Sequence, residues 1–245
     1  MINQLRWIAL LIGLIAGRAV AGDMALQVMT QGQFVHPQTY QVPSKSRLAT
    51  VINQWQLSPQ AYRLGIALLR RDEQRWQNRL RWALLYQLDD GGFNTETRTS
   101  LHHQILKFVA TGRVLERFDW DLVDLIPNQN RPLQQDDTFV APLRPNTVSV
   151  GGAAESDSLP FVPGQTVAQY MNKINRLPGF DPSYVWVVSP DTTFYRVGVS
   201  YWNREQAYLA PGSVIYVPLK DTLFHHYQAF NQSMLRLYAA QELPH

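Results

Sequence analysis

Two stretches of the sequence repeat one pattern, and this internal repeat constrains the fold more than any other feature. Residues 39–55 read TYQVPSKSRLATVINQW, and residues 159–174 read LPFVPGQTVAQYMNKI. Each stretch predicts an extended segment, then Val-Pro and a polar turn, then a helix whose apolar residues recur at matching spacing. The matching helical positions are Leu48, Val51 and Ile52 in the first copy and Val167, Tyr170 and Met171 in the second. The pattern therefore indicates two related α+β units.

A second repeated pair lies near the end of each unit. Residues 133–143 read LQQDDTFVAPL, and residues 209–219 read LAPGSVIYVPL. Both predict a turn, a strand and a closing Pro-Leu. In the first pair, Val42 and Val162 are offset by 120 residues, and the helical positions match after a one-residue shift. In the second pair, Pro142 and Pro218 are offset by 76 residues, so the first unit carries 44 extra residues between its helix and its last strand.

The extra residues fall in region 58–111, which we predict to be a helical hairpin. Its apolar residues recur at helical spacing: Leu69, Trp76, Leu80, Leu84 and Leu88. The Asp-Asp-Gly-Gly sequence at 89–92 breaks the first helix, and Asn94 or Thr95 can cap the second. Gly112 then suits the left-handed conformation that ends a helix.

Glycines 151 and 152 lie between a predicted strand and a predicted helix, which is also where many phosphate-binding loops begin. The segment 148–171 contains no Gly-Lys-Ser/Thr sequence, and the third glycine of a dinucleotide-binding motif is missing. We therefore assign these glycines to a hairpin turn that needs a positive φ.

The first 21 residues have the features of a secretory signal peptide. A short apolar run from Trp7 to Ala16 is followed by Ala19-Val20-Ala21, which fits the small-x-small cleavage rule and predicts a mature start at Gly22. Arg18 lies close to that cut, so a retained N-terminal membrane anchor is the alternative. With 0 Cys, the chain has no disulfide to support it in an oxidising compartment.

The charge of the mature chain gives no support for nucleic-acid binding. Arg6 and Arg18 leave with the signal peptide, so 20 Lys and Arg remain against 19 Asp and Glu, a net charge of +1. The arginines of region 70–81 lie beside Asp72 and Glu73 in a predicted helix, which is typical of a solvated helix face. We expect no nucleic-acid partner.

Several short motifs together resemble a known family. They are Val148-Ser149-Val150-Gly151-Gly152, Pro163-Gly164-Gln165-Thr166-Val167, Leu64 to Leu69, Thr111 to Arg113, and Pro211 to Val217. The first two resemble the soluble-ligand-binding β-grasp modules of polysaccharide export proteins. The mature chain as a whole resembles the GfcC-like group 4 capsule biosynthesis family.

The resemblance implies an α+β fold with two β-grasp domains. It places the first domain at 22–145 with the helical insert 58–111, the second at 146–219, and an amphipathic helix at 220–245. It also implies a periplasmic, non-catalytic protein that binds surface polysaccharide, its export proteins, or both, without a cofactor. Ser44-Lys45 stand where the second unit has Gly164-Gln165, so ligand binding at the first turn does not follow from the second.

One pair of acids offers an enzymatic alternative. Phe118-Asp119-Trp120-Asp121 predicts a strand with two carboxylates on one face beside a tryptophan, and glycosidases use paired carboxylates near aromatic rings. Carboxylates two residues apart on a strand lie side by side and do not flank a bond, so we favour a solvated strand edge. Trp120 remains a candidate to stack on a sugar ring. We predict no catalytic residue.

Arg113 is the strongest single candidate for binding a ligand or partner. It follows the insert and leads back into the sheet, so we expect it at a junction between subdomains, where clefts are common. Its guanidinium could hold an acidic sugar or a partner carboxylate, or tie the insert to the sheet. The neighbouring pairs His102-His103 and His225-His226 do not have metal-ligand spacing, and we predict no metal site.

The C-terminal segment predicts a helix that starts at a cap on Asp221 and runs to about Ala240. One apolar seam follows it: Leu223, Tyr227, Phe230, Met234 and Leu237. Polar residues occupy the other faces, so we expect the seam to pack on the protein's own domains and to offer Tyr227, Phe230 and Met234 to an export partner. Outer-membrane association is possible without integral insertion; a membrane-embedded export subunit is the alternative.

Overall fold

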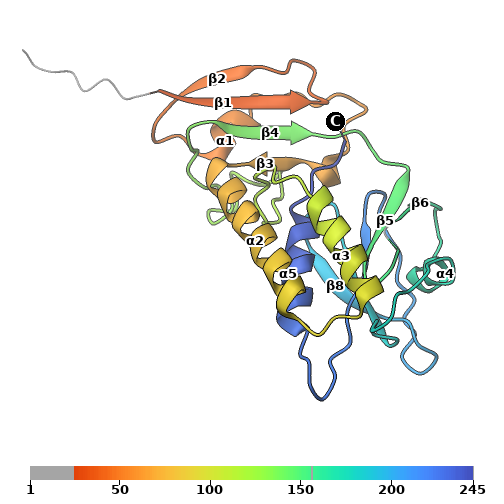
Figure 1. Cartoon of the computed structure of the whole chain (residues 1–245). Helices are drawn as coiled ribbons and strands as arrows, with labels where there is room; N and C mark the ends of the chain where they lie inside the picture. Colours follow the sequence, from red (N-terminus) through yellow and green to blue (C-terminus); the bar gives the residue numbers. More distant parts are fainter. Residues whose placement is uncertain (1–24, 156, 245) are drawn as a thin grey trace, which may run out of the picture.

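The computed structural model describes residues 25–155 and 157–244, and the predicted signal peptide at 1–21 lies outside them. The described residues form a mixed α+β structure with two sheets (Figure 1).

The first sheet has the order β2-β1-β4-β3. Its strands are β1 (Ala25–Gly32), β2 (Thr39–Pro43), β3 (Ala67–Leu69) and β4 (Asp137–Ala141). The second has the order β6-β5-β9-β7-β8. Its strands are β5 (Thr147–Gly152), β6 (Asp157–Pro160), β7 (Tyr184–Val188), β8 (Phe194–Gly198) and β9 (Val214–Val217).

The two sheets have the same order and pairing of their central elements. In each, an antiparallel hairpin is followed by a short helix, and the last strand then joins the first strand of the hairpin in parallel. Gly32 lies opposite Ala141 in the first sheet, and Gly152 lies opposite Val217 in the second. These positions differ by the offsets of 120 and 76 residues read from the sequence, so the predicted repeat is confirmed for the parallel strands.

The short helices of the two units also correspond. Helix α1 covers Leu48–Ile52 and helix α4 covers Val167–Met171. All six apolar positions matched in the sequence are buried. Thr166 and Gln169 form a capping box at the start of α4, whereas α1 begins at Arg47 without a side-chain cap. The turns before the two helices also differ, because Gly164 has a φ of 76° whereas neither Ser44 nor Lys45 has a positive φ.

The helical hairpin consists of α2 (Arg71–Asp90) and α3 (Thr95–Lys107). Asn94 caps α3 by accepting a hydrogen bond from the Glu96 N–H at 3.0 Å, which confirms one of the two predicted caps. The prediction of helix from residue 58 is wrong for residues 58–70. That stretch forms turns, a 3₁₀ turn at Arg63–Gly65 and strand β3, because its short apolar run pairs with β4. Periodicity alone does not separate such a run from a buried helix.

The hairpin contributes its apolar side chains to the core of the second sheet, although it is inserted in the first unit. Leu84, Leu88, Leu101 and Ile105 share one core cluster with β5, β7, β9 and α4. The first sheet has a separate cluster around α1, in which Phe118 and Phe139 take part. Figure 1 shows α2 and α3 extending from the first sheet to lie beside α5 and the second sheet. The insert therefore joins the two units.

The glycine pair at 151–152 contacts helix α3 of this insert. Gln104 of α3 accepts a hydrogen bond from the Gly152 N–H at 2.8 Å and donates one to the Gly152 carbonyl at 3.0 Å. The Tyr238 hydroxyl donates to the same Gln104 amide oxygen at 2.6 Å. A Cβ at residue 151 would collide with the Tyr238 hydroxyl, and one at residue 152 with the Val217 carbonyl oxygen. Gly152 has a φ of 86°, which confirms the predicted positive φ at this residue, whereas Gly151 is an extended residue of β5 that pairs with Tyr216.

Substitution of Gly152 by alanine should therefore lower the free energy of unfolding by about 2 kcal/mol, since it combines left-handed strain with a backbone collision. The matched control is Gly164→Ala. Gly164 also has a positive φ, of 76°, but a Cβ there meets no atom within 4 Å. This control should lose only about 1 kcal/mol, from the backbone alone. Urea denaturation of both variants measures the difference; equal losses would exclude the collision at Gly152.

The C-terminal helix α5 covers Gln228–Ala239, so the predicted start at Asp221 is wrong. The Asp221 carboxylate instead accepts the Tyr227 N–H at 2.6 Å, and the Thr222 hydroxyl accepts the His225 N–H at 3.0 Å. These side chains close a local turn in competition with the helix. Leu223, the first member of the predicted seam, is 92% exposed, whereas Phe230, Met234 and Leu237 are buried. Among the described residues, no helix is long and apolar enough to cross a bilayer.

Candidate functional site

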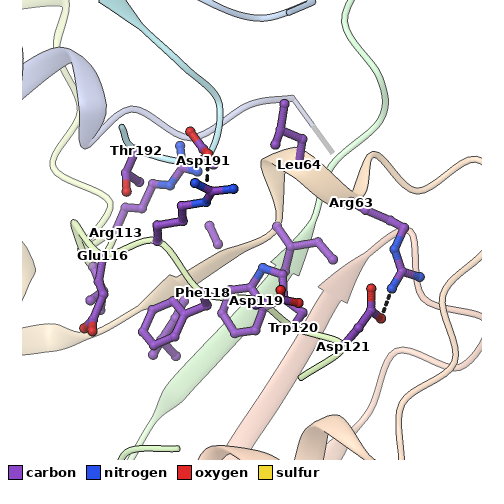
Figure 2. Close-up of a pocket in the computed structure, with 15 residues that line it drawn as sticks. Arg63, Leu64, Arg113, Glu116, Phe118, Asp119, Trp120, Asp121, Asp191 and Thr192 are labelled. Atoms are coloured by element: carbon purple, nitrogen blue, oxygen red, sulfur yellow. Dashed lines mark hydrogen bonds and ion pairs between the residues drawn. The ribbon is translucent and has the colours of Figure 1, made fainter. Parts of the chain in front are cut away.

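A cavity of ≈ 220 Å³ lies where the two units meet. Three segments line it: residues 63–68 around β3, residues 113–121 after the helical hairpin, and Asp191 and Thr192 in the β7–β8 turn. Figure 2 shows Arg113 and Asp191 on one side of this cavity and Asp119, Trp120 and Asp121 nearer Arg63. The predicted candidates Arg113 and Trp120 therefore line the same cavity, at the kind of junction that the sequence predicted for Arg113.

The hairpin exit fixes the position of Arg113. Gly112, with a φ of 89°, brings the chain close to Arg70. Gln77 of α2 accepts a hydrogen bond from the Gly112 N–H at 2.8 Å and donates one to the Arg113 carbonyl at 2.9 Å. Arg113 also forms an isolated β-bridge with Leu69. Its backbone is therefore held by both the insert and the first sheet. Gly112 has the left-handed conformation predicted for it, although α3 ends at Lys107.

The Arg113 side chain is only 3% exposed and binds main-chain oxygens. Its Nη1 donates to the Gln241 carbonyl at 2.8 Å, and its Nη2 donates to the Pro190 carbonyl. Burial lowers the pKa of the guanidinium to about 10, while the nearby carboxylates of Glu242 and Asp191 favour the charged form. The group thus remains a cation near neutral pH. Its Nε is buried without a hydrogen-bond partner.

These contacts bear on the two roles, ligand binding and joining the insert to the sheet, that the sequence left open for Arg113. An arginine at the mouth of a cleft could be replaced by alanine without harm to the fold. A buried guanidinium that links the hairpin exit to the β7–β8 turn and to the chain after α5 also holds the structure together. Alanine at position 113 should therefore destabilise the fold.

The acidic residues of the cavity are mostly paired. Asp121 forms an ion pair with Arg63, drawn as a dashed line in Figure 2. Asp191 lies 3.4 Å from the Arg117 Nε, and Glu116 lies 2.8 Å from an Arg131 nitrogen. Among the described residues, the Asp119 side chain has no such ion pair. The lining of the cavity therefore includes one carboxylate without an ion pair, Asp119, and one buried cation, Arg113.

The predicted strand at Phe118-Asp119-Trp120-Asp121 is wrong, because residues 114–131 form irregular turns. Phe118 is buried, and its ring stacks on the Trp120 ring with centroids 4.7 Å apart. Trp120 also contacts Trp55 at 5.8 Å. Packing of these aromatic rings on the first core thus replaces strand pairing and leaves Trp120 partly buried at the cavity.

The remaining predicted residues lie apart from this cavity. Tyr227 and Phe230 line a second cavity of ≈ 360 Å³ beside the turn between α2 and α3. The Phe93 ring lies 5.1 Å from the Tyr227 ring and 5.2 Å from that of Phe230, and the Tyr227 hydroxyl donates to the Gly92 carbonyl. Met234 is fully buried. These contacts anchor α5 to the hairpin.

Sequence reasoning missed Asp191 and Thr192. Asp191 holds the β7–β8 turn by accepting the Thr193 hydroxyl at 2.6 Å, and Thr192 has a φ of 70°. Ser-Pro-Asp at 189–191 is a turn signal that could have identified the turn, though not its approach to Arg113. Within residues 25–155 and 157–244, no group of three or more His, Cys, Asp or Glu is placed to hold a metal ion.

Comparison with known proteins extends the family resemblance. Residues 155–244 match the family described as capsule biosynthesis GfcC C-terminal. Over 148 residues, which are 58% of this chain, the sequence is 35% identical to the protein YjbG of Escherichia coli (strain K12). The match spans 60% of the length of YjbG. The family identified from short motifs is confirmed, and its group 4 subtype stays a prediction. The matched region of 155–244 runs from β6 through α5.

Proposed function

We propose that this protein is a non-catalytic accessory protein of capsule or exopolysaccharide biosynthesis, acting in the periplasm by binding glycan, export proteins or both. The observation that carries the proposal is the match of residues 155–244 to the capsule biosynthesis family. The duplicated unit, in which a hairpin and its last parallel strand pack on one short helix, supports two β-grasp domains. An amphipathic C-terminal helix completes the proposed arrangement, with outer-membrane association through partners and not by insertion.

Deletion of the gene with complementation tests this proposal. Cells that lack the protein should lose most of their surface polysaccharide, and the full chain should restore it. An affinity-tagged protein recovered from cells that make the polymer should retain glycan or export components. Surface polysaccharide that is unchanged by the deletion would contradict the proposed role.

A polysaccharide-modifying enzyme is the second candidate, because Asp119 and Asp121 line one cavity with Trp120. The double variant Asp119→Asn, Asp121→Asn separates the two functions. We expect it to leave the amount and chain length of the surface polymer unchanged, since Asp121 is paired with Arg63 at an exposed position and the proposed function needs no catalytic carboxylate. Polymer of altered length from a variant with normal thermal stability would favour the enzyme.

A further inference from the structure

A groove of ≈ 570 Å³, distinct from the two cavities described above, lies between strands β7 and β8 on one side and helix α5 on the other. Its lining residues run from Asp181 to Leu235 and all fall within the matched family region. None of them lines the cavity at Arg113. The groove is therefore a separate site within the C-terminal unit.

Aromatic rings form the strand side of this groove. Trp186 pairs with Arg196 across the β7–β8 ladder, and Tyr184 and Trp186 are two residues apart on β7, so these side chains share one face. The Arg196 guanidinium lies 4.2 Å from the centroid of the Tyr184 ring. The Trp186 ring lies 6.1 Å from that of Phe194, which is 40% exposed. Strand β8 is at the edge of the sheet, and Tyr184 and Trp186 on its neighbour β7 are half-buried.

Amide side chains form the helix side. Gln228 and Gln232 of α5 are exposed, and neither side chain has a hydrogen bond within the described residues. Asn231, between them, is fully used: its amide oxygen accepts the Tyr216 hydroxyl at 2.8 Å and the Leu219 N–H at 3.0 Å, and its nitrogen donates to the Leu219 carbonyl. Asn231 thus fixes α5 against the sheet, while the two glutamines present free donors and acceptors to the groove.

Two acids and two cations line the groove, and they differ in how their side chains are engaged. Asp181 accepts the Ser183 N–H at 2.8 Å, and Asp221 accepts the Tyr227 N–H at 2.6 Å, so both acids are engaged in fixing local turns. Arg196 and Lys220 form no ion pair among the described residues, although Arg196 lies over the Tyr184 ring. Two cations without an ion pair, beside an aromatic row, can bind the carboxylates of a ring-shaped ligand.

We propose that this groove binds a segment of acidic polysaccharide. Tyr184 and Trp186 contact the apolar faces of the sugar rings, Gln228 and Gln232 bond the hydroxyls, and Arg196 and Lys220 bind uronate carboxylates. The proposal deepens the proposed function and rests on it, because it names the class of glycan and the place of binding.

Titration calorimetry on the full mature chain tests the groove. The probes are short oligosaccharides of galacturonate, of mannuronate, and of alternating N-acetylglucosamine and glucuronate, each with its neutral, carboxyl-reduced counterpart. At least one acidic probe should bind, its neutral counterpart should bind about ten-fold more weakly, and added salt should weaken the acidic complex. Arg196→Ala and Lys220→Ala should each weaken binding by about ten-fold, and Arg196→Lys by less, because it keeps the charge.

Arg204→Ala is the matched control, since Arg204 is an exposed cation of the same unit outside the groove, and it should bind like the parent. Binding of no acidic probe, equal binding of the neutral probes, or an equal loss in Arg204→Ala would each overturn the groove proposal. Deletion of the gene with complementation distinguishes a failure of the groove proposal from a failure of the proposed function. If the deletion still removes surface polysaccharide, only the groove is wrong; if it does not, the proposed function fails with it.

Discussion

Removal of residues 221–245 should leave a chain that no longer folds cooperatively. Phe230, Met234, Leu235 and Leu237 of α5 are buried in the core shared by the hairpin and the second sheet. Burial of each such side chain contributes about 2 kcal/mol, or about 8 kcal/mol for the four. The net stability of a typical protein is about 5–15 kcal/mol, so this loss removes most of it. The truncated chain should also expose apolar surface that binds a hydrophobic dye.

Thermal unfolding followed by circular dichroism measures this effect, and two point variants locate its cause. Met234→Ala, at a fully buried site, should lower the free energy of unfolding by about 3 kcal/mol. Leu223→Ala, at a residue that is 92% exposed, should change it by less than about 0.5 kcal/mol. A truncated chain that melts like the full chain would show that α5 is not part of the core. Fractionation of the full chain into the outer membrane, resistant to salt and carbonate washing without a partner, would favour a membrane helix.

The repeat made much of the fold predictable from the sequence. Matching offsets of 120 and 76 residues placed the parallel strands in the register that the structure has, with Gly32 and Gly152 at equivalent positions. A repeat is informative because each copy must bury the same face of the same short helix. The apolar positions of α1 and α4 therefore had to match, and they do.

The errors fall where local signals compete with tertiary contacts. Residues 67–69 were predicted to be helical but pair with β4. Residues 118–121 were predicted to form a strand, but the rings of Phe118 and Trp120 stack on each other instead. Asp221 was a plausible helix cap, yet it closes a turn before the helix begins. In each case the decisive partner is distant in sequence or is one of several local hydrogen-bond choices.

The candidate site was less predictable than the fold. The Thr-Gly-Arg turn after the hairpin singled out Arg113 and its position between subdomains. Its actual partners, the carbonyls of Pro190 and Gln241, are 77 and 128 residues away in the chain. No spacing rule links an arginine to such backbone oxygens, so its burial could not be predicted. The Asp191 side of the cavity was missed for the same reason.

Alanine at position 113 should lower the free energy of unfolding by about 3 kcal/mol. The change leaves the carbonyl oxygens of Pro190 and Gln241 without the charged donor that now binds them inside the protein. Part of this loss is offset, because the guanidinium no longer has to be buried; that same cost lowers its pKa to about 10. Urea denaturation of purified Arg113→Ala measures the change.

Arg117→Ala is the control, because Arg117 lines the same cavity but its side chain is 72% exposed. Its ion pair with Asp191 should be worth less than about 1 kcal/mol. Arg113→Lys keeps the charge, yet a single ammonium cannot reproduce the forked contact with both carbonyls, so its stability should fall between those of the parent and the alanine variant.

Cellular complementation then separates two roles for Arg113. If Arg113→Ala lowers stability and surface polysaccharide together, and Arg113→Lys recovers both in proportion, the arginine acts by joining the hairpin to the second unit. If Arg113→Ala keeps the parent's stability and still abolishes polysaccharide, the guanidinium acts directly on a ligand or partner.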